Sequence, residues 1–450
     1  MKIKTIIYIL ILGVFIQQKS IAQPNWPLIK SNTTPSVSIP SEFGTPYKQP
    51  LSVLGWEDGI FISRDGLDLY CIYVPIDLFS WTFFGPANPT NFSSYLRGPT
   101  FGMDLITNPI GASEWLQADI LYSHRNTTND SFLVWSLSNL ANPVFSEGAP
   151  QHNAINSSTV DLFVTTSNSS PPNYSTDIVL LKNTSINPST QGSFLPAPVN
   201  TQYKEDNPHI ERIDPLNLVL FFDSDDRPGG LGQLDIWYCT SSDNGLTWTN
   251  PQQVSTLNTA NIGEQQPHLY KDANNVWYIY YTGANSITGK TEIFRAKQAT
   301  SGNWDSWINI ESIVGAGNGL AVGEPTLTQN GDLSFVVIYQ DAVNGTATDK
   351  YDADPWFLPK IGSPTSVKHN PEFSEPSILL SPNPSSEKLS INLLNSKAPE
   401  PVMIFNSLGI LVKEINLGAS TVIDIKQFDN GLYFIFLKNN PSIYSKFMKQ

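Results

Sequence analysis

Hydrophobic and polar residues repeat along the middle of the chain with a period of about 58 residues. A glutamate three residues before a proline recurs in this period as Glu147, Glu205 and Glu264, and a contracted copy follows at Glu324-Pro325. A second marker, an acidic residue before an apolar, aromatic-rich run, keeps the same period at Asp119, Asp177, Asp235, Glu292 and Asp354. A further apolar run lies between the two markers in each unit. Short runs of this kind, bounded by Gly, Pro and Asn, are typical of β-strands, so each unit is predicted to contain three or four strands.

Five such units predict a five-bladed β-propeller over residues 46–360. A four-stranded unit cannot bury both of its faces alone, whereas radial stacking covers both faces and leaves only short edges. The first unit begins at Glu57 and is stretched by an insertion over residues 74–118. The fifth unit lacks a fourth strand. The segment near 46–54 is predicted to supply that strand and to close the ring.

The composition agrees with an all-β protein and narrows the choice of partners. Only 15% of the 450 residues are charged, and 29 Gly, 34 Pro, 17 Tyr and 23 Phe favour turns and strands over long helices. Residues 23–376 hold 16 basic and 35 acidic residues, a net charge of −19. A body this acidic repels phosphate backbones and anionic lipid surfaces, so nucleic acid is not an expected partner. Neutral glycans and proteins remain open as ligands.

The N-terminus has the features of a secretory signal peptide over residues 1–22. It has a basic start, an apolar run at 6–16 and small residues just before the expected cleavage site. The mature chain is predicted to begin at Gln23, with residues 23–45 as a leader. The apolar run is shorter than the roughly 20 residues that a membrane-spanning helix needs, and no later run reaches that length, so no membrane span is predicted.

Residues 378–450 follow a Pro- and Ser-rich linker at 361–377 and are predicted to form a small C-terminal β-sandwich. They carry a Pro-Asn-Pro motif at 382–384, an apolar hairpin around Gly409, a turn at 429–433 and a Lys-rich final strand. With these motifs in this order, the tail resembles the type A C-terminal sorting domain of type IX secretion cargo. The resemblance implies a Bacteroidetes-type protein that binds the type IX secretion machinery, crosses the periplasm and outer membrane, and stays on the cell surface or is released. A carbohydrate-binding sandwich is the alternative interpretation.

The third repeat unit carries a second resemblance. The run FFDSDDRPGGLGQLDIWY from Phe221 resembles the WD-like propeller repeat of TolB-type proteins. The turn after it, Ser241-x-Asp243-x-Gly245-x-x-Trp248, is similar to the Asp-box of sialidase-type propellers. The Asp-box is a structural turn in that family. The resemblance therefore implies a fold rather than an activity.

Carboxylates repeat at the start of the first strand of each unit, which in a propeller lines the central channel. The repeated glutamates are expected at equivalent positions in the units. The candidate site residues are Glu57, Asp58, Glu147, Glu205, Asp206, Glu264 and Glu324. Carboxylates gathered around one funnel raise one another's pKa, which can place a general acid beside an ionised base. The architecture resembles five-bladed glycosidases of the arabinanase type, which implies that two or three of these carboxylates carry catalysis. The same residues could instead hold neighbouring blades together by hydrogen bonds.

Other side chains extend this picture. Four aromatic residues in or near the first unit are candidates for stacking on sugar rings: Trp56, Trp81, Tyr95 and Trp115. His209 and His268 follow the repeated prolines and are candidates for holding a divalent cation with Glu205 and Glu264. No other cofactor is predicted, because no phosphate-binding loop, nucleophile elbow or paired Cys-x-x-Cys is present. The sequence thus predicts a secreted glycan- or protein-binding module, with a glycoside hydrolase as the alternative, and leaves open whether the chain is an enzyme.

Overall fold

The computed structural model describes residues 24–84, 95–99, 101, 118–141, 146–154, 159–168, 176–190, 192–225, 227–361, 377–381, 384–394, 400–407, 409–418 and 420–450. The chain divides into two compact units, Met1–Val367 and Lys368–Gln450. Both helices among the described residues are only seven residues long. The protein is therefore nearly all-β, as predicted from its composition. The predicted signal peptide lies outside the described residues.

The first unit contains five consecutive groups of antiparallel strands. The first group consists of β3 (Trp56–Ile62), β4 (Asp68–Val74), β5 (Asp119–His124) and β6 (Ser136–Leu137). The second consists of β7 (Glu147–His152), β8 (Thr159–Asn168), β9 (Thr176–Ser185) and β10 (Ser193–Phe194). The third consists of β11 (Asp206–Arg212), β12 (Leu218–Ser224), β13 (Asp235–Ser241) and β14 (Gln252–Gln253). The fourth consists of β15 (Glu264–Lys271), β16 (Trp277–Ala284), β17 (Thr291–Gln298) and β18 (Trp307–Gly315), and the fifth of β19 (Ala321–Leu327), β20 (Leu333–Gln340) and β21 (Tyr351–Leu358).

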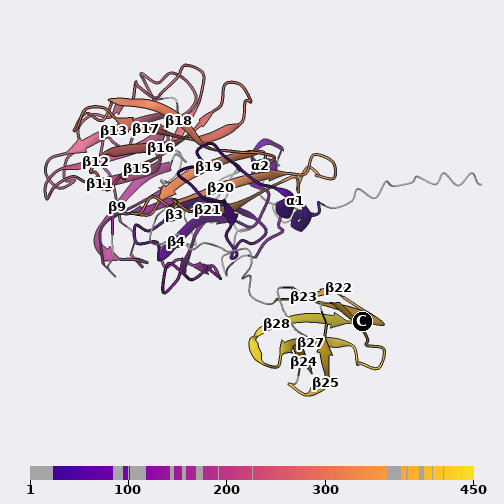
Figure 1. Cartoon of the computed structure of the whole chain (residues 1–450). Coiled ribbons are helices and arrows are strands. Elements are labelled where there is room, and N and C mark those ends of the chain that lie inside the picture. Colours follow the sequence, from indigo (N-terminus) through magenta and orange to yellow (C-terminus); the bar gives the residue numbers. More distant parts are fainter. Residues whose placement is uncertain are drawn as a thin grey trace, which may run out of the picture. The chain divides into compact units, whose positions relative to one another are not determined.

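The N-terminal segment adds one short edge strand to the fourth group and one to the fifth. After α1 (Trp26–Asn32), β1 (Ser36–Val37) pairs with β18, and β2 (Tyr47–Lys48) pairs with β21. The fifth and first groups are joined through one parallel pairing of β21 with β3, so that together with β2 they form a single eight-stranded sheet (Figure 1). The sheets therefore do not appear as five separate blades, and the five-bladed arrangement stays a prediction.

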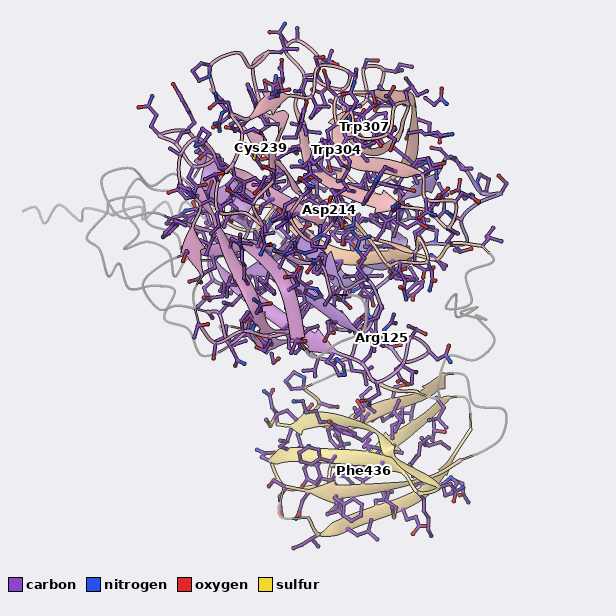
Figure 2. The ribbon with its side chains drawn as sticks, turned by 90° about the vertical axis from the view of Figure 1, so that its left-hand side faces the viewer. Arg125, Asp214, Cys239, Trp304, Trp307 and Phe436 are labelled. Carbon is purple, nitrogen blue, oxygen red and sulfur yellow. The ribbon has the colours of Figure 1, made fainter. Side chains whose placement is uncertain are left out.

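Inner strands of the first unit are buried on both faces, as β12 in the third group shows. Leu220 and Phe222 pack into a core shared with the second group, and Val219 and Phe221 pack into a core shared with the fourth group. At the outer end of that second core, the indole N–H of Trp307 donates to the carbonyl of Trp304 at 2.7 Å (Figure 2). A strand buried on both faces reads as a continuous apolar run, which explains the sequence LVLFF.

The first strands of the five groups contact one another in a closed cycle, in the order β3, β7, β11, β15, β19 and back to β3. Each of these strands has a bulge at the same position. One residue in each bulge has a left-handed backbone conformation, with φ between 42° and 59°. In chain order these residues are Gly59, Ala149, Asn207, Gln266 and Glu324. Non-glycine residues rarely adopt this conformation, and such strain tends to gather at functional sites. The five bulges therefore direct attention to the space that the first strands enclose.

Aromatic and histidine rings fill the middle of that space. Phe61 lies 4.9 Å from His152 and 6.5 Å from His268, and His209 lies 4.3 Å from His268, measured between ring centroids. All three histidines are buried. Burial lowers the pKa of each, in His152 to about 3, and so favours the neutral form of the rings. This plug, formed by Phe61, His152, His209 and His268, separates the two ends of the channel.

The predicted insertion between β4 and β5 contains α2 (Leu78–Phe84). Its described aromatic residues pack inward rather than forming an open platform for sugar rings. Trp56 is fully buried and lies 4.4 Å from Phe79, and Tyr95 is buried with Trp81 at 5.2 Å in an edge-on contact. Trp115 lies outside the described residues.

The second unit contains two small sheets. One has the order β22-β23-β26 and the other β25-β24-β27-β28. Their bounds are β22 (Ser377–Ser381), β23 (Lys388–Leu394), β24 (Glu400–Asn406), β25 (Leu411–Leu417), β26 (Ser420–Asp424), β27 (Gly431–Leu437) and β28 (Asn440–Lys449). Alternating apolar residues such as Leu389, Ile391, Val402 and Ile404 form its own core. Because that core is self-contained, this unit needs no packing from the first.

Candidate functional site

The repeated glutamates at the start of the first strands are buried and hold the chain that precedes them. Glu57 accepts the backbone N–H of Val53 at 3.3 Å and the indole N–H of Trp135 at 2.5 Å. Glu205 likewise accepts the Thr201 N–H at 3.1 Å and a hydrogen bond from Arg227 Nη1 at 2.9 Å. Glu264 accepts the Thr259 N–H at 3.0 Å. Glu147 is also buried. The contacts of Glu57, Glu205 and Glu264 with the surrounding chain favour the stapling role over the catalytic one.

The stapling role predicts a stability cost when Glu205 is replaced by Gln. The glutamine amide cannot accept the Thr201 N–H and also neutralise the charge of Arg227, whose side chain is 9% exposed. We therefore expect a loss of about 1–3 kcal/mol in the free energy of unfolding. Urea denaturation measures it, and Glu311→Gln, at a side chain 45% exposed, is the control expected to change little. A Glu205→Gln variant with unchanged stability and lost ligand binding or turnover would instead place Glu205 in the site.

A second set of carboxylates gathers beside the bulges of these first strands, with one member on the neighbouring strand β12. Asp58 and Asp206 occupy equivalent positions just before the bulges of β3 and β11, and both are half-buried. Asp223 of β12 is fully buried and lies directly opposite Asp206 in the strand register. Glu324, at the bulge of β19, is 9% exposed and forms a hydrogen bond with Asp58 through their side chains. We call these four residues the carboxylate cluster.

Two bulge residues hold the carboxylate cluster in place. The Gln266 side chain donates to Glu324 Oε1 at 2.5 Å and accepts the Glu324 backbone N–H at 3.1 Å. The Gln266 backbone N–H and the Asn207 side chain both donate to Asp223 Oδ2, at 2.7 and 2.8 Å. Asp223 Oδ1 is buried and has no hydrogen-bond partner among the described residues. Residues of several strands therefore hold the cluster in place, and one carboxylate oxygen, Asp223 Oδ1, receives no hydrogen bond from the described residues.

Burial is the largest cause that raises the pKa of each group in the carboxylate cluster, and repulsion between the groups adds to it in three of them. The pKa of Asp223 rises to about 7 and that of Asp206 to about 6. The pKa of Glu324 is raised well above its usual value, because the side chain is buried and faces Asp58, Asp223 and Asp206. For Asp58, burial raises the pKa while hydrogen bonds from Trp56, Gly59 and Glu324 oppose the rise. Burial thus biases the Glu324 carboxyl group toward its protonated form, beside an Asp206 whose pKa is about 6.

Glu324 of the carboxylate cluster lines a narrow cavity of about 10 Å³. Its lining includes the five bulge residues Gly59, Ala149, Asn207, Gln266 and Glu324. Polar groups that are buried against one another at the mouth of a cavity, with perturbed pKa values, are the usual mark of a functional site.

The sequence prediction needs one correction and misses one residue. Glu324 was expected at the position of the other repeated glutamates, but the strand registers place Val322 there and Glu324 at the bulge. The bulge turns its carboxyl group toward Asp58 instead of back into the loop. Asp223 was not predicted because it lies on a second strand. The available signal was a single acidic residue ending the buried run LVLFF.

The histidines do not assemble the predicted cation site with Glu205 and Glu264. His209 bonds to Gln151 Oε1 at 2.5 Å and Glu211 Oε1 at 3.0 Å, and His268 Nε2 accepts the Leu327 N–H at 3.2 Å. In the described part of the chain, no group of three or more His, Cys, Asp or Glu residues is arranged to hold a metal ion. The two glutamates bond to their own loops, so the divalent cation gains no support from the geometry.

Comparison with known proteins identifies the tail. Residues 380–450 match the family model of the secretion system C-terminal sorting domain. This is the type IX sorting domain, so the protein is exported to the cell surface or the extracellular space. Within the described ranges, no helix is both long and apolar enough to cross a membrane. A search of curated proteins gives no significant match.

Several solved structures are similar to the chain at low identity. The endo-arabinase from Bacteroides thetaiotaomicron is 14% identical with a TM-score of 0.39, and the match covers 69% of this chain and 96% of that one. Sucrose-6-phosphate hydrolase from Lactobacillus gasseri is 11% identical with a TM-score of 0.44, covering 90% and 87%. The catalytic domain of the Coprinopsis cinerea GH62 α-L-arabinofuranosidase is 9% identical with a TM-score of 0.40, covering 69% and 92%. Because these TM-scores are below 0.5, we base fold and function on this chain's own strands and side chains.

Proposed function

We propose that this chain is an exported glycoside hydrolase whose carboxylate cluster performs acid–base catalysis at one mouth of a five-bladed propeller. The propeller is supported by the closed cycle of first strands, by their five equivalent bulges and by the pairing of β2 with β21. The predicted Asp-box adds to this: Asp243 accepts the N–H groups of Leu246 and Thr247 at 3.0 and 2.9 Å, and Trp248 is buried in the core beside them.

The observation that carries hydrolysis is the gathering of Glu324 with Asp58, Asp206 and Asp223 beside the bulges, where burial and the neighbouring carboxylates raise the pKa of Glu324 well above its usual value and that of Asp206 to about 6. Glycoside hydrolysis needs one carboxylic acid to protonate the leaving oxygen and one carboxylate to act on the other side of the sugar. We assign Glu324 as the acid and half-buried Asp206 as the base. As the bond to the anomeric carbon breaks, the Glu324 proton passes to the leaving oxygen, water adds to that carbon, and Asp206 takes the proton of the water. The negative charge of Asp58 keeps the proton on Glu324 until then.

Neutral sugars are the substrates that this electrostatic setting favours. A body with a net charge of −19 repels anionic substrates. Carboxylates accept hydrogen bonds from sugar hydroxyls, and Glu324 lines the cavity beside the half-buried Asp58 and Asp206.

Glycan binding without hydrolysis is the second candidate, because two observations favour it. The hydrogen bond between Asp58 and Glu324 holds these two groups closer than the roughly 5 Å or more between the carboxyls of a catalytic pair. The adjoining cavity of about 10 Å³ is also far smaller than most ligand pockets. In this case the cluster would fix the orientation of a glycan, or of a protein partner, at the mouth.

The test is hydrolysis of neutral polysaccharides by the mature protein and by Glu324→Gln and Asp206→Asn. We expect each variant to lose about two to four orders of magnitude in turnover with little change in melting temperature, because the amides keep shape and remove the proton transfer. Asp305→Asn, in a turn of the fourth group away from the channel, is the matched control. Binding of the same polysaccharides without turnover by the unaltered protein would reject hydrolysis in favour of the second candidate.

A further inference from the structure

A large hollow lies at the end of the channel opposite the carboxylate cluster. Its volume is about 860 Å³. All five first strands reach it at their far ends: Arg64 follows β3, Asn153 follows β7, Arg212 ends β11, Lys271 ends β15 and Gln329 follows β19. We call this space the far hollow.

The far hollow is separate from the carboxylate cluster. The first strands are six to eight residues long, and at about 3.3 Å per residue they place roughly 20 Å between the two ends. The plug of Phe61 and the three histidines fills the channel between them. A ligand at one end therefore leaves the other end free.

The cations of the far hollow are largely neutralised by neighbouring carboxylates. Arg64 forms an ion pair with Glu211, and Arg212 forms one with Asp161 while also donating to Asn244 Oδ1 at 2.8 Å. Arginines committed in this way are poorly placed to hold a phosphate or another anion. The hollow is instead suited to an uncharged ligand.

The remaining lining residues suit a sugar. Trp277 is half-buried and faces the hollow, with Lys271 Nζ 5.2 Å from the centre of its ring. Asn153, Asn244 and Gln329 contribute side-chain amides. Amide groups donate and accept hydrogen bonds, as sugar hydroxyls do, and an indole offers a flat apolar face.

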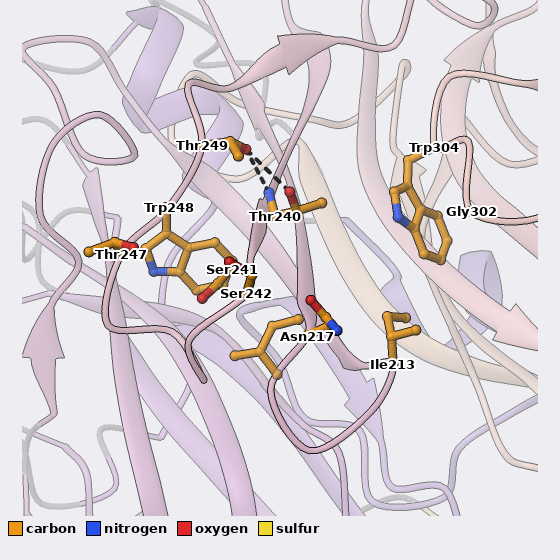
Figure 3. A pocket seen from close by; sticks show the side chains of 11 residues that line it. Ile213, Asn217, Thr240, Ser241, Ser242, Thr247, Trp248, Thr249, Gly302 and Trp304 are labelled. Atoms are coloured by element: carbon orange, nitrogen blue, oxygen red, sulfur yellow. Dashed lines mark hydrogen bonds between the residues drawn. The ribbon is translucent and has the colours of Figure 1, made fainter.

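A second hollow continues the same surface. It has a volume of about 370 Å³ and shares Ile213 with the far hollow. Figure 3 shows Trp248 and Trp304 on its two sides, with hydroxyl groups of Thr240, Ser241 and Thr249 between them. Trp304 also contacts Trp277 edge-on at 5.7 Å, so the aromatic lining runs from one hollow into the next.

We propose that the two hollows together form an accessory binding site for a neutral polysaccharide, distinct from the carboxylate cluster. One part of the glycan stacks on Trp277 and bonds to the amides, and the chain continues past Ile213 into the second hollow. Such a site keeps the exported protein on its glycan, whether or not the carboxylate cluster hydrolyses it. The proposal therefore stands apart from the proposed hydrolase function.

Affinity electrophoresis of the mature chain tests the accessory site, with arabinoxylan, galactomannan, mixed-linkage β-glucan and dextran as probes and polygalacturonate as the anionic probe. All variants carry Glu324→Gln, so that turnover does not affect the gels. We expect retardation by at least one neutral probe. Trp277→Ala should weaken that binding about tenfold, which corresponds to about 1.4 kcal/mol. Phe194→Ala, at an aromatic residue 50% exposed on β10, is the control expected to bind normally.

A second variant guards against an effect of Trp277→Ala on folding. Ile213 is 43% exposed at the junction of the two hollows, and Ile213→Arg should block the junction without disturbing the core. We expect it to weaken binding with an unchanged melting temperature. No retardation by any neutral probe, retardation by polygalacturonate alone, or equal binding by Ile213→Arg and the unaltered protein would each overturn the proposal. Hydrolysis of short oligosaccharides, measured without Glu324→Gln, should be unaffected by either variant, which separates failure of this site from failure of the catalytic one.

Discussion

Replacement of Lys30 by methionine should lower the free energy of unfolding of the mature protein by about 3–5 kcal/mol, because it leaves buried charge without its partner. Lys30 Nζ lies 2.6 Å from Asp352 Oδ2 and 2.7 Å from Asp354 Oδ1, and both aspartates are fully buried. Burial alone would lower the pKa of Lys30, but its attraction to Asp354 and Asp352 outweighs burial and raises that pKa. The ion pairs tie α1 to β21, which joins the first and last strand groups.

Urea denaturation at neutral pH measures this loss. Lys204→Met is the control, since Lys204 is 61% exposed and its ion pair with Asp225 at 3.5 Å is expected to contribute less than about 1 kcal/mol. Replacing Asp352 and Asp354 by asparagine in the Lys30→Met background should restore part of the stability, because the two buried carboxylates that lost Lys30 are removed, while Arg97 keeps its ion pair with Asp349. A Lys30→Met protein as stable as Lys204→Met would show that the N-terminal segment does not hold the fold together.

Removal of residues 380–450 should abolish the appearance of the protein outside the cell. The deleted part matches the sorting domain, and the residues before Lys368 form their own compact unit, so the truncated chain should fold and accumulate within the cell envelope. Immunoblots of medium, surface and periplasmic fractions from a type IX-secreting host give the distribution. Glu414→Gln, at a side chain 42% exposed in the same domain, is the matched control. Normal amounts of the truncated chain in the medium would reject the sorting role.

The repeats allowed much of the fold to be predicted, because each strand of the body has local signals. Acidic and proline markers recur at fixed steps, and apolar runs between them become strands buried on both faces. The N-terminal segment was less accessible to prediction. The partners of Lys30, Asp352 and Asp354, lie more than 300 residues away in the sequence, and nothing near Lys30 indicates them.

The candidate site was predicted only in part, for a reason that lies in strand geometry. Successive side chains of a strand point to opposite faces, so the neighbours Glu205 and Asp206 have different surroundings although both are acidic. Glu205 turns back to Thr201 and Arg227, whereas Asp206 joins the carboxylate cluster. A bulge then changes the direction of Glu324. The sequence period locates the strand ends, but only the pairing register shows which carboxyl groups meet.

The pH dependence of kcat/KM tests the carboxylate cluster most directly. Asp206 must be ionised, so activity should fall as the pH drops through its pKa of about 6, and Glu324 must be protonated, so activity should also fall above its raised pKa. Asp58→Asn removes a negative charge that raises the pKa of both groups. The account therefore predicts that both limbs of the profile move to lower pH in this variant. A profile that is unchanged by Asp58→Asn, in a protein that still hydrolyses glycans after Asp206→Asn and Glu324→Gln, would contradict it.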